Sequence, residues 1–305
     1  MPAARRPPPT RGGGSRSRQP PPRQPRERVP RAPRQPRERR QRSDLGARVI
    51  VAIPAAILAI AFIDFGGLAF ALFMIVFGCA CLNELYQLLE RWKPVPLVGF
   101  AALVAMVLGA RFGTQRDVIE AALAAVPLVF LAVAARGHSG GATVAIAGTM
   151  LGIYWIGFAF AHAELLRQLP HGKPLVLDVA IGTFLGDTGA YLGGRLFGRV
   201  PLAPSISPSK TIEGLFCGGL VAILAVYFAA QNSTSWLTHG DALLLGLAIA
   251  ILGPIGDLFV SLIKRDAGAK DAGTMFGAHG GALDRLDGVM FTIVAAYYIW
   301  LAVMH

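Results

Sequence analysis

One short segment between apolar stretches combines acidic and basic residues: Gly256 to Gly288, which reads GDLFVSLIKRDAGAKDAGTMFGAHGGALDRLDG. It holds five Asp, two Lys, two Arg and one His within 33 residues, and it lies between two apolar stretches. Ionisable groups beside a bilayer are costly and usually mark a functional site. Asp oxygens suit a divalent cation, whereas Lys and Arg suit phosphate. The segment therefore predicts a site for a metal and a phosphorylated substrate.

Three Asp of this segment can converge from two neighbouring helices. Asp284 and Asp287 are three residues apart, so they share one face at the start of the last apolar helix. Asp257 comes from the preceding helix, directly after Gly253-Pro254, where we expect a kink and a freed backbone carbonyl. We predict that these three carboxylates form an oxygen cage for Mg²⁺.

Two earlier stretches add polar groups. GTFLGDTGAYLGGRLFG places Asp187 inside an apolar helix, where a carboxylate needs a partner or a water-filled cavity. The alternative is a polar contact between helices that pack closely at glycines. PLAPSISPSKTIEG supplies Ser209, Lys210 and Thr211 just before the next helix, and donors at a helix N-terminus make an anion site. Capping of that helix by Ser209 or Thr211, with Glu213 in its first turn, is compatible with this interpretation.

Composition indicates a membrane protein preceded by a basic tail. Of the 305 residues, 54% are hydrophobic and 15% are charged, which is too apolar for an ordinary soluble protein. Residues 1–42 hold 14 Arg and two Glu, so this tail carries +12 and leaves −1 of the net +11 for the rest of the chain. We expect residues 1–44 to be disordered and cytoplasmic, either attracted to anionic lipid or simply solvated. We expect no nucleic-acid partner, because the tail has no aromatic side chain for base stacking.

Hydropathy predicts an all-α, polytopic integral membrane protein with about nine transmembrane helices. The expected spans are roughly 47–64, 66–83, 95–112, 119–135, 142–161, 174–194, 212–230, 241–263 and 287–304. We divide the chain into the tail (1–44), an N-terminal helical region (45–170) and a C-terminal catalytic region (171–305).

The distribution of Lys and Arg predicts the orientation, because cytoplasmic loops carry more of them. With the tail inside, four connections face the cytoplasm, and they contain Arg91, Lys93, Arg136, Arg195, Arg199, Lys210, Lys264, Arg265, Lys270 and Arg285. The outward connections contain Arg111, Arg116, Arg167 and Lys173. Both charge-rich loops, 195–211 and 264–287, are therefore expected on the cytoplasmic side of a bacterial-type inner membrane.

The segment SLIKRDAGAKDAGTMFGAHGGALDRLD closely resembles the signature of phosphatidate cytidylyltransferases, also called CDP-diacylglycerol synthases. The matching positions are Ser261, Lys264, Arg265, Lys270, Asp271, His279, Gly280, Gly281, Asp284, Arg285 and Asp287. GDTGAYLGGRLFG at 186–198 and SPSKTIEG at 207–214 are similar to the family as well. The chain departs from the family pattern at Gly277-Ala278, where Pro-Gly is usual, and at Gly288, where Ser is common.

The resemblance implies that CTP and phosphatidic acid react to give CDP-diacylglycerol and pyrophosphate with Mg²⁺. It also implies Asp257 and Asp284 as metal ligands, to which the spacing adds Asp287, and a homodimer. We expect catalytic roles for Asp187, Lys210, Lys264, Lys270, Asp271, His279 and Arg285. We expect CTP to be bound by Ser209, Lys210, Lys264, Arg265, Gly280 and Gly281.

Two alternatives remain on the sequence alone. One is a related enzyme that acts on another lipid phosphate, because nothing in the sequence shows acyl-chain or backbone preference. The other is a membrane transporter with intramembrane acids and broken helices. Against a transporter, the charges gather at one membrane face and no inverted repeat is visible.

Overall fold

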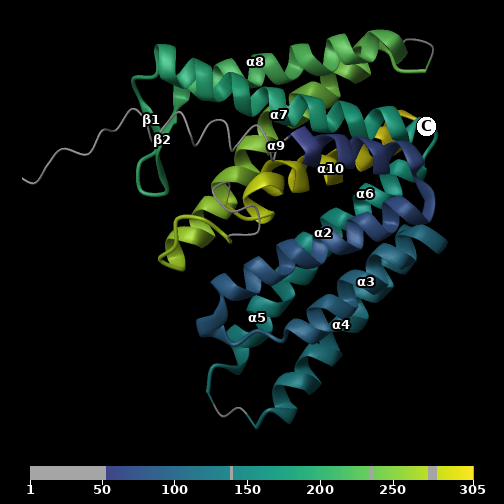
Figure 1. Ribbon diagram of the computed structural model, residues 1–305, viewed down its shortest axis with the longest axis vertical. Coiled ribbons are helices and arrows are strands. Elements are labelled where there is room, and N and C mark those ends of the chain that lie inside the picture. Colours follow the sequence, from purple (N-terminus) through teal and green to yellow (C-terminus); the bar gives the residue numbers. More distant parts are fainter. Residues whose placement is uncertain (1–52, 138–139, 234–235, 274–279, 305) are drawn as a thin grey trace, which may run out of the picture. The chain divides into compact units, whose positions relative to one another are not determined.

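The apolar stretches of the sequence form helices (Figure 1), in a computed structural model that describes residues 53–137, 140–233, 236–273 and 280–304. The predictions for the tail, for the beginning of the first span and for His279 lie outside these residues. The elements in chain order are the helix Ile53–Phe65, α2 Gly67–Leu88, η1 Glu90–Trp92, α3 Pro96–Phe112, α4 Gln115–Ala135, α5 Ala142–Gly152, η2 Ile153–Gly157, α6 Phe158–Gln168, α7 Gly172–Phe197, β1 Pro201–Ala203, β2 Ser207–Thr211, α8 Ile212–Ala229, η3 Ala230–Ser233, α9 His239–Asp266 and α10 Leu283–Val303.

Seven helices in the described part of the chain are long and apolar enough to cross a membrane. They are α2, α4, the continuous run Ala142–Gln168, α7, α8, α9 and α10. The other two predicted spans correspond to shorter apolar helices, Ile53–Phe65 and Pro96–Phe112. The all-α polytopic class is thereby confirmed, although α3, with 17 residues, is shorter than the ~20 residues that a bilayer needs.

One local feature was not expected from the sequence, whereas a second, the passage of one helix through Pro254, agrees with the predicted span 241–263. The loop before α8 forms an antiparallel hairpin in which Pro201 pairs with Thr211 and Ala203 with Ser207. Helix α9 continues from His239 to Asp266 through Pro254, which stands inside it. Proline has no N–H and so leaves one carbonyl of the preceding turn without its helical partner, but the helix does not end there.

Close packing at glycines brings the C-terminal helices together. A side chain at Gly256 of α9 would meet the backbone oxygen of Asp287 on α10 at 2.4 Å, and one at Gly288 would lie 3.3 Å from the carbonyl oxygen of Gly253. Thr183 of α7 joins the same place through a 3.1 Å hydrogen bond to Thr292 of α10. Helices α7, α9 and α10 therefore meet at one junction, as small residues permit inside a membrane.

Helices α7 and α8 pack in the same way. A Cβ at Gly193 would lie 2.3 Å from the Cβ of Cys217, and a Cβ at Gly218 would lie 2.7 Å from the carbonyl oxygen of Gly186. The glycines of the GTFLGDTGAYLGG stretch thus act as packing residues, as expected from their spacing.

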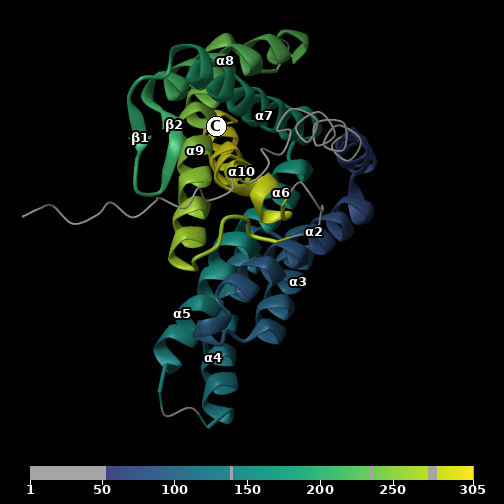
Figure 2. The ribbon, with the colours of Figure 1, turned by 60° about the vertical axis from the view of Figure 1, so that its left-hand side comes forward.

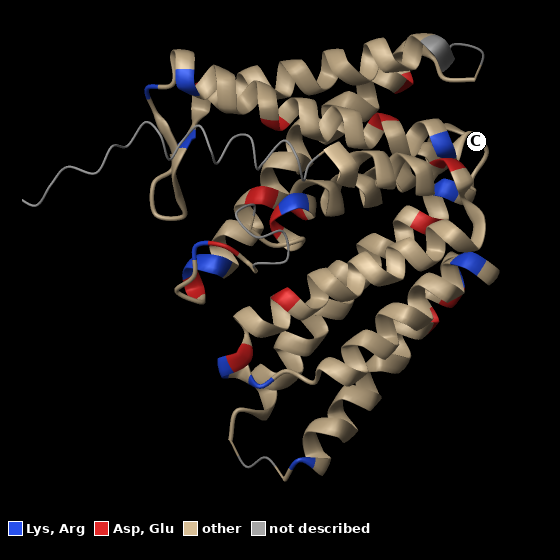
Figure 3. Cartoon of the chain, in the orientation of Figure 1, with Lys and Arg blue, Asp and Glu red and all other residues tan. Residues whose placement is uncertain are grey.

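Polar contacts group the helix ends into two sets. At one end Arg91 pairs with Asp266, and Arg136 donates to the carbonyl oxygen of Pro94 at 3.1 Å. At the other end Lys173 pairs with Asp64. The first set joins residues that the charge distribution placed in cytoplasmic connections. Figure 3 shows most of the charged residues near the helix ends, with long uncharged stretches between them.

The glycine junction makes a testable prediction about stability. We expect Gly256→Ala to destabilise the protein by about 1–3 kcal/mol, because the added methyl group would overlap the backbone of α10. The matched control is Gly219→Ala on α8, whose Cβ would lie 3.5 Å from that of Ala250, an ordinary contact. Thermal unfolding in detergent measures both, and equal Tm values for the two variants would contradict the junction.

Candidate active site

The hairpin β1–β2 is held at its base by the first turn of α8. Thr211 is the N-cap of that helix, and its hydroxyl oxygen accepts the backbone N–H of Gly214 at 3.1 Å. The carboxylate of Glu213 turns back and accepts the backbone N–H of Arg199 at 3.0 Å and that of Val200 at 3.3 Å. The capping interpretation of SPSKTIEG therefore holds for Thr211, and the hairpin gains a fixed base.

The hairpin lies beside helix α9 in Figure 2 and places Lys210 next to that helix. Lys210 forms an ion pair with Asp257, and the side chains are 26% and 32% exposed. Near the end of α9, Arg265 Nε donates to the backbone oxygen of Ile206 at 3.1 Å. These two contacts connect the 195–211 loop to the helix that carries the second charged segment.

Three carboxylates gather around Lys210. Asp187 on α7 is within electrostatic range of Asp257 and Lys210, and Asp287 on α10 is within range of all three. The glycine junction explains the arrangement, because Asp257 follows Gly256 and Asp287 precedes Gly288. Three carboxyl groups therefore face one nearby Lys in a largely apolar surrounding, and their oxygens outnumber its cation. Divalent cations favour such oxygen ligands.

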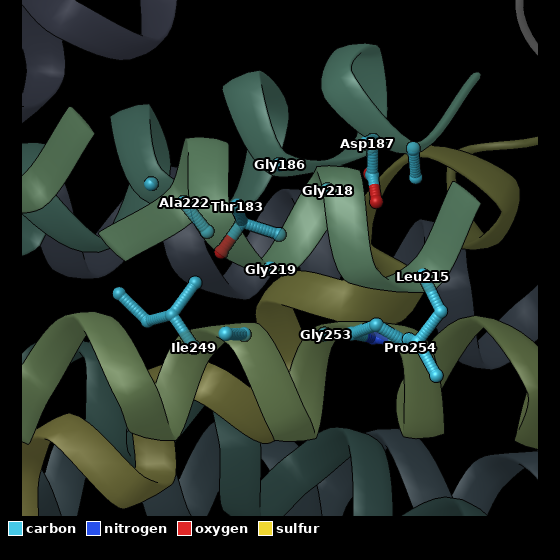
Figure 4. Close-up of a pocket in the computed structure, with 13 residues that line it drawn as sticks. Thr183, Gly186, Asp187, Leu215, Gly218, Gly219, Ala222, Ile249, Gly253 and Pro254 are labelled. Atoms are coloured by element: carbon cyan, nitrogen blue, oxygen red, sulfur yellow. The ribbon is translucent and has the colours of Figure 1, made fainter. Parts of the chain in front are cut away.

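Asp187 also lines a small cavity between α7, α8 and α9. Figure 4 shows its carboxylate pointing into that space, with Thr183 from the same helix and Pro254 on the opposite wall. Gly218 and Gly219 form the α8 side. A carboxylate inside a membrane needs either a partner or room for water, and the cavity beside Asp187 provides such room.

Asp284 lies one helical turn before Asp287 at the start of α10 and is more enclosed than Asp257. Its Oδ1 accepts Lys264 Nζ at 2.6 Å, and the side chains are only 10% and 14% exposed. Its Oδ2 accepts the backbone N–H of Ala272 at 2.8 Å and that of Gly281 at 3.0 Å. Asp284 therefore binds the loop between α9 and α10 at two places, Ala272 and Gly281. Three donors from the described residues thus occupy three of the about four lone-pair positions of this carboxylate.

The remaining predicted residues surround this loop and the hairpin. Gly280 adopts a positive φ of 80°, which favours glycine. Ser261 is buried within α9. Those with exposed side chains are Ser209, Arg265, Lys270, Asp271 and Arg285.

Sequence reasoning missed Glu84 of α2. Its carboxylate accepts the backbone N–H groups of Ala282 and Leu283 at 3.0 and 2.9 Å, directly beside the predicted site. The acid stands just after the predicted span 66–83, where it reads as an ordinary helix-end residue. Its partners lie 198 and 199 residues away, so only the structure could identify them.

The acidic side chains of the site are oxygen ligands of the kind that a divalent cation prefers, but they do not form a compact cluster. Within the ranges that the structure describes, no three His, Cys, Asp or Glu side chains stand together as a metal-binding group. The acids are instead held by Lys210 and Lys264. Asp257 and Asp287 approach each other from adjoining helices, and both are oxygen ligands of the type that Mg²⁺ prefers.

The fold and the site define a polytopic helical membrane protein with acids and cations gathered at one end of its C-terminal helices. Residues 46–303 match the cytidylyltransferase family, and the chain belongs to that family. Nucleotide transfer is therefore the class of reaction, which decides against the transporter alternative.

Curated relatives agree with this placement. The chain is 32% identical over 253 residues to the phosphatidate cytidylyltransferase of Staphylococcus aureus (strain COL), which covers 81% of this chain and 95% of the relative. Proteins with the same name from Staphylococcus epidermidis (strain ATCC 12228) and Staphylococcus haemolyticus (strain JCSC1435) are each 31% identical over 253 residues, with the same coverage.

The enclosed Lys264–Asp284 pair makes a prediction about coupling. We expect Lys264→Met and Asp284→Asn to show a coupling energy of about 1 kcal/mol or more in a double-mutant cycle, because the pair is largely shielded from water. The control cycle is Arg116→Met with Glu120→Gln, a pair with side chains 86% and 58% exposed. That pair should couple by less than about 0.5 kcal/mol. Tm in detergent measures both cycles, and equal couplings would contradict the burial argument.

Proposed function

We infer that this chain is a phosphatidate cytidylyltransferase, which converts CTP and phosphatidic acid to CDP-diacylglycerol and pyrophosphate. The family membership carries this conclusion, and the names of the relatives supply the lipid substrate. The site adds physical support, because it combines carboxylates with Lys210 and Lys264 at the end of a membrane helix bundle. A phosphorylated lipid and a nucleotide can meet at such a place.

The reaction forms one bond and breaks one bond at the α-phosphorus of CTP. An oxygen of the lipid phosphate attacks that phosphorus, and the bond to the bridging oxygen of pyrophosphate breaks. A phosphate monoester is already ionised near neutral pH, so a general base is not obligatory. Phosphoryl transfer of this kind depends mostly on positioning and on neutralising charge.

The cations of the site perform that neutralisation in our proposal. Lys210 and Lys264 would exchange their carboxylate partners for phosphate oxygens, while Lys270, Arg265 and Arg285 add positive charge at the loop. Ser209 supplies a hydroxyl donor beside Lys210. The backbone at Gly280 and Gly281 lets phosphate approach closely. Catalytic roles for Asp187, Asp271 and His279 remain proposals, and His279 lies outside the described residues.

We propose Mg²⁺ as the cofactor, held by Asp257, Asp284 and Asp287. The three acids near Lys210 support this assignment, because carboxylate oxygens are the ligands that a divalent cation prefers. When bound, such an ion neutralises phosphate oxygens and the leaving pyrophosphate. Asp187 lies within electrostatic range of Asp257, so its carboxylate would help to retain the ion.

Orientation and assembly are further proposals. CTP is cytosolic and highly charged, so the site should face the cytoplasm, in agreement with the Lys and Arg distribution. The bacterial relatives support a cell-membrane location. The family resemblance supports a homodimer, which the mass of the purified protein in detergent tests.

The metal assignment predicts loss of turnover. We expect Asp257→Asn and Asp284→Asn each to lower kcat at least about 100-fold at saturating Mg²⁺, because a lost charged ligand costs several kcal/mol in the transition state. Cytidylyl transfer from labelled CTP to phosphatidic acid in micelles measures this. The control is Asp266→Asn at the end of α9, whose exposed ion pair with Arg91 contributes little. Near-normal turnover of either active-site variant would refute its role as a ligand.

The orientation predicts sided labelling across α8. Ser205, in the hairpin before α8, and Gln231, just after it, are both exposed. In an active variant without Cys79, Cys81 and Cys217, Ser205→Cys should react with an impermeant thiol reagent only from the cytoplasmic side. Gln231→Cys should react only from outside. Reaction of the cysteine at position 205 with the impermeant reagent in intact cells would contradict the predicted orientation.

A further inference from the structure

Glu84 is not one of the proposed catalytic residues, but it binds the backbone at the start of α10, directly beside the site. It lies on α2 and is only 4% exposed. Its Oε1 accepts the backbone N–H of Ala282 at 3.0 Å, and its Oε2 accepts that of Leu283 at 2.9 Å. Because the first N–H groups of a helix have no partner within it, these bonds fix the beginning of α10.

Two glycines of the loop between α9 and α10 also pack directly against Glu84. A Cβ at Gly273 would lie 2.5 Å from Oε1, and a Cβ at Gly281 would lie 2.1 Å from Oε2. Either position could carry a side chain only if the carboxylate moved. The second glycine of the His-Gly-Gly motif is therefore needed partly for the approach of Glu84.

Glu84 and Asp284 hold the same short backbone from two sides. Asp284 accepts the N–H groups of Ala272 and Gly281, and it also binds Lys264. Glu84 takes the next two N–H groups, those of Ala282 and Leu283. The position of the Lys264–Asp284 pair relative to α2 thus depends on Glu84 through the backbone that both carboxylates bind.

We propose that Glu84 is a positioning residue for nucleotidyl transfer. It holds the backbone at Gly273 and Gly281–Leu283 in the conformation that places Asp284 and Lys264 for the reaction. The role rests on the proposed function, and Glu84 itself does not touch the substrate. The N-terminal helices thereby contribute to catalysis, although every predicted site residue lies after position 170.

The chemistry of the contact requires a carboxylate. Two N–H donors need two acceptor oxygens, and a carboxylate supplies both. A glutamine of the same shape supplies one, and its NH₂ group would face the other donor. A negative charge at a helix N-terminus is additionally favoured by the helix dipole.

The experiment compares Glu84→Gln, Glu84→Ala and wild type for cytidylyl transfer from CTP to phosphatidic acid in micelles. We expect kcat/KM for CTP to fall at least about tenfold in Glu84→Gln and further in Glu84→Ala, since bonds to charged groups are among the stronger ones. Glu90→Gln is the matched control, because this acid near the end of the same helical stretch is exposed. It should stay within about twofold of wild type.

A second control separates positioning from simple loss of stability. Leu103→Ala removes a fully buried side chain of α3 that packs against Gly78 of α2. It should lower Tm without changing kcat/KM of the folded protein. The positioning role is overturned if Leu103→Ala reduces kcat/KM as much as Glu84→Gln does. It is also overturned if Glu84→Gln lowers Tm but leaves kcat/KM unchanged. Should Glu84→Ala fail to fold, the isosteric Gln variant decides.

Amide hydrogen exchange provides a readout that does not need activity. Peptides covering 280–286 should exchange faster in Glu84→Gln than in wild type or Glu90→Gln, because one of the two N–H groups loses its acceptor. Unchanged exchange would overturn the contact and the proposal with it. If wild type shows no cytidylyl transfer, the proposed function fails, while the exchange result still judges the Glu84 contact.

Discussion

The close approach of α7, α9 and α10 is the constraint on which the rest of the site depends. Gly253, Gly256 and Gly288 have no side chain at the places where the helix backbones meet. In a bilayer, helices gain little from the hydrophobic effect between them, so such tight contacts provide much of their association. The carboxylates of Asp257 and Asp287 adjoin these glycines, and the packing therefore sets their separation. Gly288, where the family more often has Ser, belongs to this contact.

Bringing acids together beside a membrane requires compensation, and the structure provides it with cations from elsewhere in the chain. The hairpin brings Lys210 to Asp257, while Lys264 reaches Asp284 from the preceding helix. An unpaired buried charge would be strongly unfavourable. The same cations are suited to phosphate, so the groups that stabilise the carboxylates are available to the nucleotide. Structure and chemistry use one set of side chains.

The helices could be predicted well because their cause is local. A run of about 20 apolar residues must satisfy its own backbone in lipid, and the helix is the means available to a single segment. Boundaries were less accurate, since α2 continues to Leu88 beyond the predicted end at 83, and the run Ala142–Gln168 continues beyond the predicted end at 161. The hairpin at 201–211 was not expected, because it is stabilised by Glu213 and Arg265 from outside the loop.

By itself, the sequence determined the membrane class, the two charge-rich loops and the kinds of residue available for the chemistry. Residue type, spacing and hydropathy are properties of neighbouring positions, so they can be read without coordinates. Only the tertiary structure decided which residues meet: Lys210 with Asp257, Lys264 with Asp284, and Glu84 with the backbone of Ala282 and Leu283. Such pairings depend on helix packing over long sequence separations. Glu84 shows this most clearly, since nothing near it in the chain identifies its partners.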